Sequence, residues 1–119
     1  MTQSNEPDGI GRLPALPALP ALRAMSTAER ARAIGHCLRL ELGVILKVPP
    51  GHRVSAGRPL RSQGLDPVDA LWLGRRIGRA LHTELAVEQI RDGTVADLAE
   101  GLAARLEPAT PASAGAERR

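Results

Sequence analysis

The chain has 119 residues, enough for one small domain with terminal segments. Its 16 basic and 13 acidic residues leave a net charge of +3, which gives no strong indication of nucleic-acid binding. Aromatic residues make up 1% of the chain, so base stacking is nearly excluded, and the single cysteine, Cys37, excludes an intrachain disulfide. The histidines lack ligand spacing, so neither a metal nor a cofactor is expected. No signal peptide and no run of about 20 apolar residues is found, which predicts a cytoplasmic protein.

Residues 1–25 are predicted to be a proline-rich N-terminal tail. A Leu-Pro-Ala repeat runs from Leu13 to Leu22, and proline at every third position disfavours a helix and favours polyproline II. Its leucines would share one edge, so the segment is interpreted as a stiff linker or as a docking strip for a partner. Residues 108–119 lack apolar periodicity and are predicted to be a disordered tail. A single domain over 26–107 lies between them.

The domain is predicted to begin with a long helix. Ser26 and Glu29 have the spacing of a capping box, and apolar residues recur behind them at helical spacing to about Lys47. The sequence Val48-Pro49-Pro50-Gly51 ends this helix. A long loop follows, which three apolar residues are expected to pin to the core: Val54, Leu60 and Leu65.

A second helix is predicted from Pro67 to Leu81, with Asp66 as its N-cap, because proline is favoured at the first helical position. The inward face is expected to comprise Ala70, Leu71, Leu73, Ile77 and Leu81. Helical spacing from Val68 places on the outward stripe Trp72, Arg75, Arg76 and Arg79.

A short helical segment is expected near 87–91, and Thr94 is the predicted cap of a last helix with an apolar stripe to Leu106. The elements therefore predict an all-α bundle with three main helices, one short helix and a long loop between the first two.

This order of elements and four motifs resemble the acyl carrier proteins, in particular the carrier domains of polyketide synthases. The motifs are Arg58-Pro59-Leu60, Gly64-Leu65-Asp66 before the second helix, Ala70-Leu71-Trp72-Leu73-Gly74-Arg75-Arg76-Ile77 within it, and Asp92-Gly93-Thr94-Val95-Ala96-Asp97-Leu98-Ala99 leading into the last helix. The resemblance covers roughly 26–107 and implies a four-helix carrier fold.

The resemblance also implies that an attachment residue is missing. In the family, a serine follows the Asp and carries a phosphopantetheine arm, whereas Pro67 occupies that position here and has no hydroxyl. The nearest alternative hydroxyl is that of Ser62, five residues earlier. No phosphopantetheine attachment is therefore expected at the usual place.

The outward stripe is a candidate partner-binding surface. Carrier proteins commonly present an acidic second helix to their enzymes, whereas this helix carries arginines and would suit a partner with an acidic or apolar surface. Trp72 is either a core residue or a binding hot spot beside those arginines, and the arginines are either a site or a solvated face.

Three functions are consistent with these patterns. The first is a carrier-like protein that cannot be modified and acts by protein contacts in a polyketide or related thiotemplate pathway. The second is a genuine carrier modified at another residue, and the third is a small basic nucleic-acid-binding helical protein. No catalytic constellation is visible, so an enzyme is not expected.

Overall fold

The computed structural model describes residue 13 and residues 15–106, and these residues form helices and loops with no strand among them. The elements in order are α1 (Leu19–Ala24), α2 (Thr27–Ile45), the 3-10 helix η3 (Arg61–Gln63), α3 (Pro67–Leu81), α4 (Val87–Asp92) and α5 (Val95–Arg105). The predicted all-α bundle, with three main helices and one short one, is confirmed. No described helix is long and apolar enough to cross a membrane.

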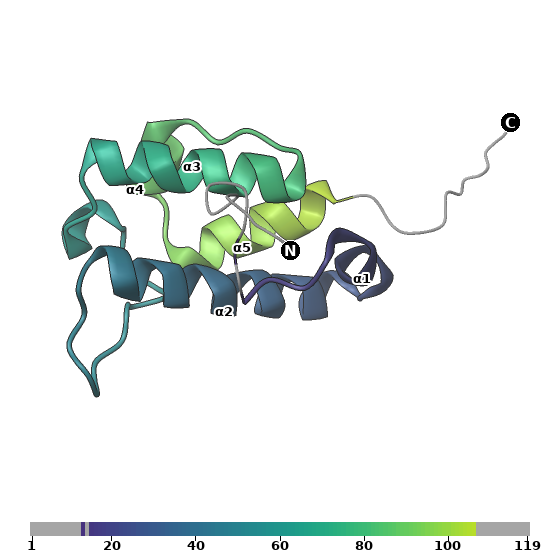
Figure 1. The fold of residues 1–119 in the computed structure, drawn as a ribbon, viewed down its shortest axis with the longest axis horizontal. Helices are drawn as coiled ribbons and strands as arrows, with labels where there is room; N and C mark the ends of the chain where they lie inside the picture. The colour runs from purple at the N-terminus through teal and green to yellow at the C-terminus, as the bar shows by residue number, and fades with distance from the viewer. Residues whose placement is uncertain (1–12, 14, 107–119) are drawn as a thin grey trace, which may run out of the picture.

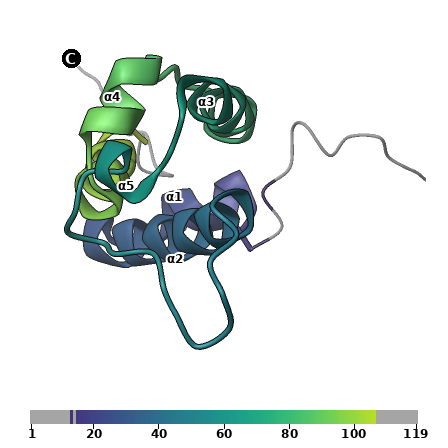
Figure 2. The ribbon, with the colours of Figure 1, turned by 90° about the vertical axis from the view of Figure 1, so that its left-hand side faces the viewer.

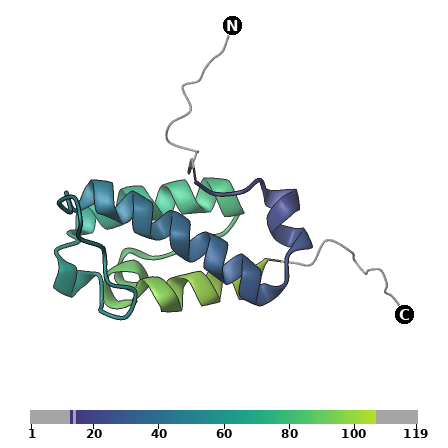
Figure 3. The ribbon, with the colours of Figure 1, turned by 90° about the horizontal axis from the view of Figure 1, so that it is seen from below.

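The three long helices surround one aliphatic core. The helix α2 packs along α5, and α3 packs against α4, as Figures 1 and 3 show. Each long helix begins where its cap predicts. Glu29 N–H donates to Ser26 Oγ at 3.1 Å, and Asp97 N–H donates to Thr94 Oγ1 at 3.0 Å. Because these caps satisfy otherwise free backbone donors, they fix the helix starts that the sequence indicates.

The long loop after α2 is held to the core as predicted. Val54, Leu60 and Leu65 are all buried. The Gln63 side chain ties the loop to η3, since its Oε1 accepts from Ser55 N–H at 2.8 Å and its Nε2 donates to the Ser55 carbonyl at 3.0 Å. The loop is therefore an ordered part of the domain, projecting from the α2 side of the bundle in Figure 2.

The N-terminal repeat departs from the prediction. Within the segment expected to form polyproline II, residues from Leu19 onward form α1, and Leu13 and Leu22 are buried in the core. Pro20 lies in the first helical turn, where its missing N–H removes no intrahelical bond. Since these leucines pack on their own domain, neither a linker nor a leucine docking strip describes them. Residues 1–12 and 14, and the predicted tail over 108–119, lie outside the described residues.

A buried arginine joins α1 to the bundle. Arg30 is only 4% exposed, and within the described part of the chain it is hydrogen-bonded to backbone carbonyls rather than to a carboxylate. Its guanidinium instead donates to five carbonyl oxygens at the C-terminal ends of α1 and α5: those of Leu22, Arg23, Met25, Ala103 and Leu106. Helix C-termini carry partial negative charge and free carbonyls, so they compensate the buried cation.

Candidate functional site

The start of α3 is built by three residues in succession. Gly64 has a φ of 102°, a left-handed conformation that favours glycine, and it turns the chain out of η3. Leu65 then anchors the chain in the core. Asp66 caps the helix, since its Oδ1 accepts from Asp69 N–H at 2.8 Å. Pro67 is the first helical residue and is exposed, so the backbone is that of a regular capped helix presenting a prolyl ring to solvent.

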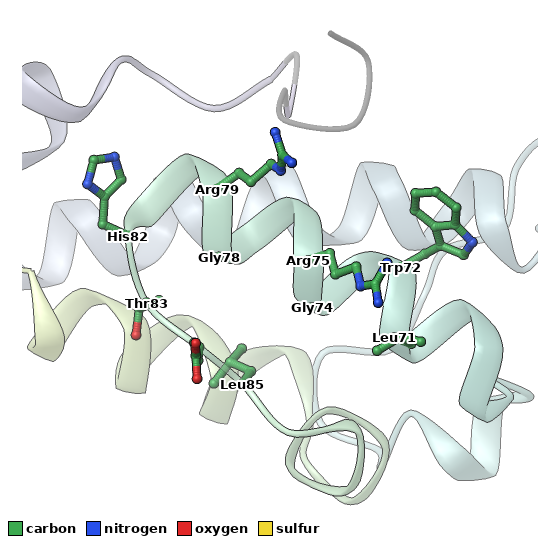
Figure 4. A pocket seen from close by; sticks show the side chains of 10 residues that line it. Leu71, Trp72, Gly74, Arg75, Gly78, Arg79, His82, Thr83 and Leu85 are labelled. Atoms are coloured by element: carbon green, nitrogen blue, oxygen red, sulfur yellow. The ribbon is translucent and has the colours of Figure 1, made fainter.

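The predicted outward stripe is largely exposed. Val68 is 64% exposed and Trp72 46%, and Arg75 and Arg79 are exposed beside them. Figure 4 shows Trp72, Arg75 and Arg79 projecting from the same helix. Trp72 is therefore not a core residue, and the stripe combines apolar and cationic groups on one surface, a composition common in protein-binding sites.

Arg76 does not belong to this stripe. Its Nη1 lies 2.5 Å from Glu41 Oε1 on α2, and the two side chains are 22% and 16% exposed. The residue was expected to face a partner, but α2 approaches this side of α3 and supplies a carboxylate for it. Arg76 therefore joins α3 to α2 through this ion pair.

Leu71 also differs from its predicted place, because it is 45% exposed rather than part of the inward face. The inward face consists of Ala70, Leu73, Ile77 and Leu81, all buried. Leu71 instead lies at the edge of a groove next to Trp72 (Figure 4). It therefore adds a third exposed apolar side chain to those of Val68 and Trp72.

The groove runs between α3 and the segment Thr83–Leu85 that connects it to α4. Its volume is about 680 Å³, and Leu71, Trp72, Arg75 and Arg79 line it from the helix side. The connecting segment can lie close because α3 carries glycines there: a Cβ on Gly78 would be 2.8 Å from the Thr83 carbonyl oxygen. The sequence did not predict that Thr83–Leu85 forms one wall of the groove, because the close approach of a loop to a helix leaves no periodic pattern.

The described residues contain no group of His, Cys, Asp or Glu side chains arranged to hold a metal ion. Burial raises the pKa of the Cys37 thiol to about 11, with Glu41 adding to the effect. A neutral, buried thiol is a poor nucleophile, so Cys37 acts as a small core residue.

The family model for the phosphopantetheine attachment site matches residues 37–102, more than half of the chain. The chain belongs to this family. The matched segment runs from the middle of α2 into α5 and so includes α3 with its groove, whereas α1 and Arg30 precede it.

Curated relatives of this carrier-family chain include polyketide synthases. Over 71 residues, the chain is 37% identical to lovastatin nonaketide synthase mokA of Monascus pilosus. The aligned segment covers 59% of this chain and 2% of that protein. The chain is 34% identical over 74 residues to the polyketide synthase component of lovastatin nonaketide synthase from Aspergillus terreus, covering 61% and 2%. The chain thus spans only a small part of these relatives. No solved structure matches it significantly.

Proposed function

We propose that this carrier-family chain acts through protein contacts, rather than by carrying a phosphopantetheine arm, in polyketide or related thiotemplate biosynthesis. The observation that carries the proposal is Pro67, the first residue of α3 directly after the cap Asp66. By resemblance to the family, this is the place of the modified serine. A prolyl ring keeps the helix start intact but has no hydroxyl for attachment.

The exposed side of α3 supports a binding role. Val68, Leu71 and Trp72 offer apolar area, and Arg75 and Arg79 add positive charge along the same groove. Such a surface suits a partner with an acidic or apolar docking face, since like charges across an interface disfavour binding. The chain would then occupy a carrier's docking place on a synthase or tailoring enzyme, bridge two enzymes, or regulate one.

Modification is tested with a broad-specificity phosphopantetheinyl transferase, coenzyme A and intact mass measurement. We expect no mass gain for the natural chain and a gain of one arm for Pro67→Ser, the matched variant that restores the hydroxyl. A gain by the natural chain would refute the loss of modification. If neither chain gains mass while an authentic carrier does, Pro67 does not occupy the attachment position.

Binding is tested by calorimetric titration with the polyketide synthase encoded nearest to this chain's gene. Trp72→Ala and Arg79→Glu should each weaken binding by tenfold or more, because hot-spot residues contribute on the order of 2 kcal/mol. The control is Arg32→Glu, an exposed charge reversal on α2. Equal affinity of the natural chain and all three variants would exclude the α3 surface as the binding site.

A genuine carrier modified at another residue is the second candidate, because Ser62 on η3 is exposed and precedes Pro67 by five residues. A mass gain by the natural chain that Ser62→Ala abolishes would establish it.

Nucleic-acid binding is less well supported, since many arginines are engaged within the domain. Those with hydrogen bonds to protein groups are Arg30, Arg61, Arg76, Arg91 and Arg105. DNA affinity that falls steeply with added salt would favour this third function.

A further inference from the structure

A second groove lies on the opposite side of the bundle from the α3 groove. It runs between the C-terminal half of α2 and the loop segment from Val48 to Val54, and its volume is about 500 Å³. We call it the α2 groove. In Figures 1 and 2 this loop projects below α2, away from α3. The two grooves have no lining residue in common.

Two exposed aliphatic side chains on α2 line the α2 groove. Leu40 is 50% exposed and Val44 78%, and the two residues are one helical turn apart on α2. A single exposed aliphatic residue is ordinary on a protein surface. Two adjacent ones beside a concave wall instead form a continuous apolar strip that a partner side chain can cover.

Two arginines and two histidines line the groove beside this strip. Arg39 and His36 lie on α2, Arg53 and His52 lie on the loop, and no acidic residue lines the groove. The acidic residue of this part of α2, Glu41, pairs with Arg76 on the α3 side. The groove lining therefore combines exposed aliphatic side chains with Arg39 and Arg53, which is complementary to an apolar segment flanked by carboxylates.

The loop wall is formed before any partner binds. Val54 is buried, and the neighbouring Ser55 is hydrogen-bonded at both its N–H and its carbonyl to the Gln63 side chain. His52 N–H donates to the Pro49 carbonyl at 3.1 Å, which closes the turn at the tip of the loop. A preformed wall lowers the entropy lost on association, because fewer groups must be ordered.

We propose that the α2 groove is a second protein-docking site, which binds an amphipathic helix that has leucine-like residues on one edge and carboxylates beside them. Helix-in-groove recognition requires an apolar strip of this kind, and the two arginines of the lining, Arg39 and Arg53, select the charge of the partner helix. Because it lies apart from α3, a chain bound through α3 can hold a second partner here. This site uses neither Pro67 nor Trp72, so a test of the α2 groove is independent of a test of the function proposed above.

The probe is a 15-residue helical peptide with leucines at i and i+4 spacing and flanking glutamates, titrated into the ¹⁵N-labelled full chain. We expect amide shifts to cluster at residues 40–44 and 52–54. Val44→Glu should weaken binding about tenfold or more, since it places a charge on the apolar strip and repels the glutamates. Ala104→Glu, which places the same charge at an exposed position of α5 outside both grooves, should leave binding unchanged.

Two further comparisons guard against nonspecific effects. Arg53→Glu should weaken binding, whereas Arg58→Glu, a charge reversal in the same loop outside the groove, should not. Emission from Trp72, the only tryptophan, should stay constant because this residue lies in the other groove.

Four results would overturn the proposal. They are absence of binding at millimolar peptide, equal binding of the peptide with lysines in place of glutamates, shifts centred on α3 with altered Trp72 emission, and binding to phosphatidylcholine–phosphatidylserine vesicles in preference to the peptide.

Discussion

Replacing Arg30 with methionine should loosen the attachment of α1 to the rest of the bundle. Methionine retains much of the apolar stem but donates no hydrogen bond. Three of these hydrogen bonds are buried, those to the carbonyls of Leu22, Ala103 and Leu106 at 2.8 to 3.0 Å. The Leu22 carbonyl also accepts from Met25 N–H, so among the described residues only the carbonyls of Ala103 and Leu106 lose their donor. A buried carbonyl that loses its donor costs at least about 1 kcal/mol.

The expected loss of unfolding free energy is therefore about 2 kcal/mol, which lowers the melting temperature of a domain this size by about 8–16 °C. Urea denaturation followed by circular dichroism measures it. Arg30→Lys should recover less than half of the loss, because one ammonium group cannot reach the ends of α1 and α5 together as the forked guanidinium does.

The matched control is Arg32→Met, the same substitution two residues later at an exposed position of α2. Surface changes of this kind usually stay within about 0.5 kcal/mol. If Arg30→Met and Arg32→Met differ by less than about 0.5 kcal/mol, the five carbonyl contacts do not stabilise the fold and the reasoning fails.

Three further predictions concern the packing of the domain. Cys37 should resist thiol reagents at pH 8 in the folded chain and react when the chain unfolds. Because the pKa of this thiol is about 11 in the folded chain and ordinarily 9.0, the unfolding free energy should decline as pH rises from about 9 to 11. Denaturation at stepped pH measures this decline. Gly78→Ala should destabilise the chain by about 1 kcal/mol through its clash with the Thr83 carbonyl, whereas Gly101→Ala, with no atom within 4 Å, should stabilise it by about 0.5–1 kcal/mol in the same urea assay. Arg76→Gln should lower the unfolding free energy by about 1–2 kcal/mol by losing its ion pair with α2, and equal stability of variant and natural chain would contradict that role.

Local signals in the sequence were sufficient for the long helices. The caps Ser26, Asp66 and Thr94 each bond as predicted, because a side chain three residues from a free N–H needs no tertiary contact to act. By contrast, α1 depends on burial of Leu22 in the common core, which no local pattern encodes. Arg30 was missed for the same reason, since its partners lie up to 76 residues away.

The error at Arg76 has a geometrical origin. At 3.6 residues per turn, Trp72, Arg75 and Arg79 lie within about 40° of Val68 around the helix, whereas Arg76 lies about 80° away. That rotation carries it from the exposed stripe toward α2, where Glu41 lies within bonding distance. The predicted stripe was therefore too wide by one residue, and Arg76, which forms an ion pair with Glu41, was predicted to contact a partner.

The Arg30 contacts and the α2 groove lie at opposite ends of this fold. In Figures 1 and 3, α1 packs at the end of the bundle where α5 finishes, and the loop of the α2 groove lies at the other end. Arg30, which joins α1 to α5, lines neither groove. Loss of the Arg30 contacts should therefore lower stability without changing affinity at either surface, whereas Val44→Glu and Trp72→Ala should do the reverse. This separation allows a loss of partner binding in the surface variants to be distinguished from unfolding.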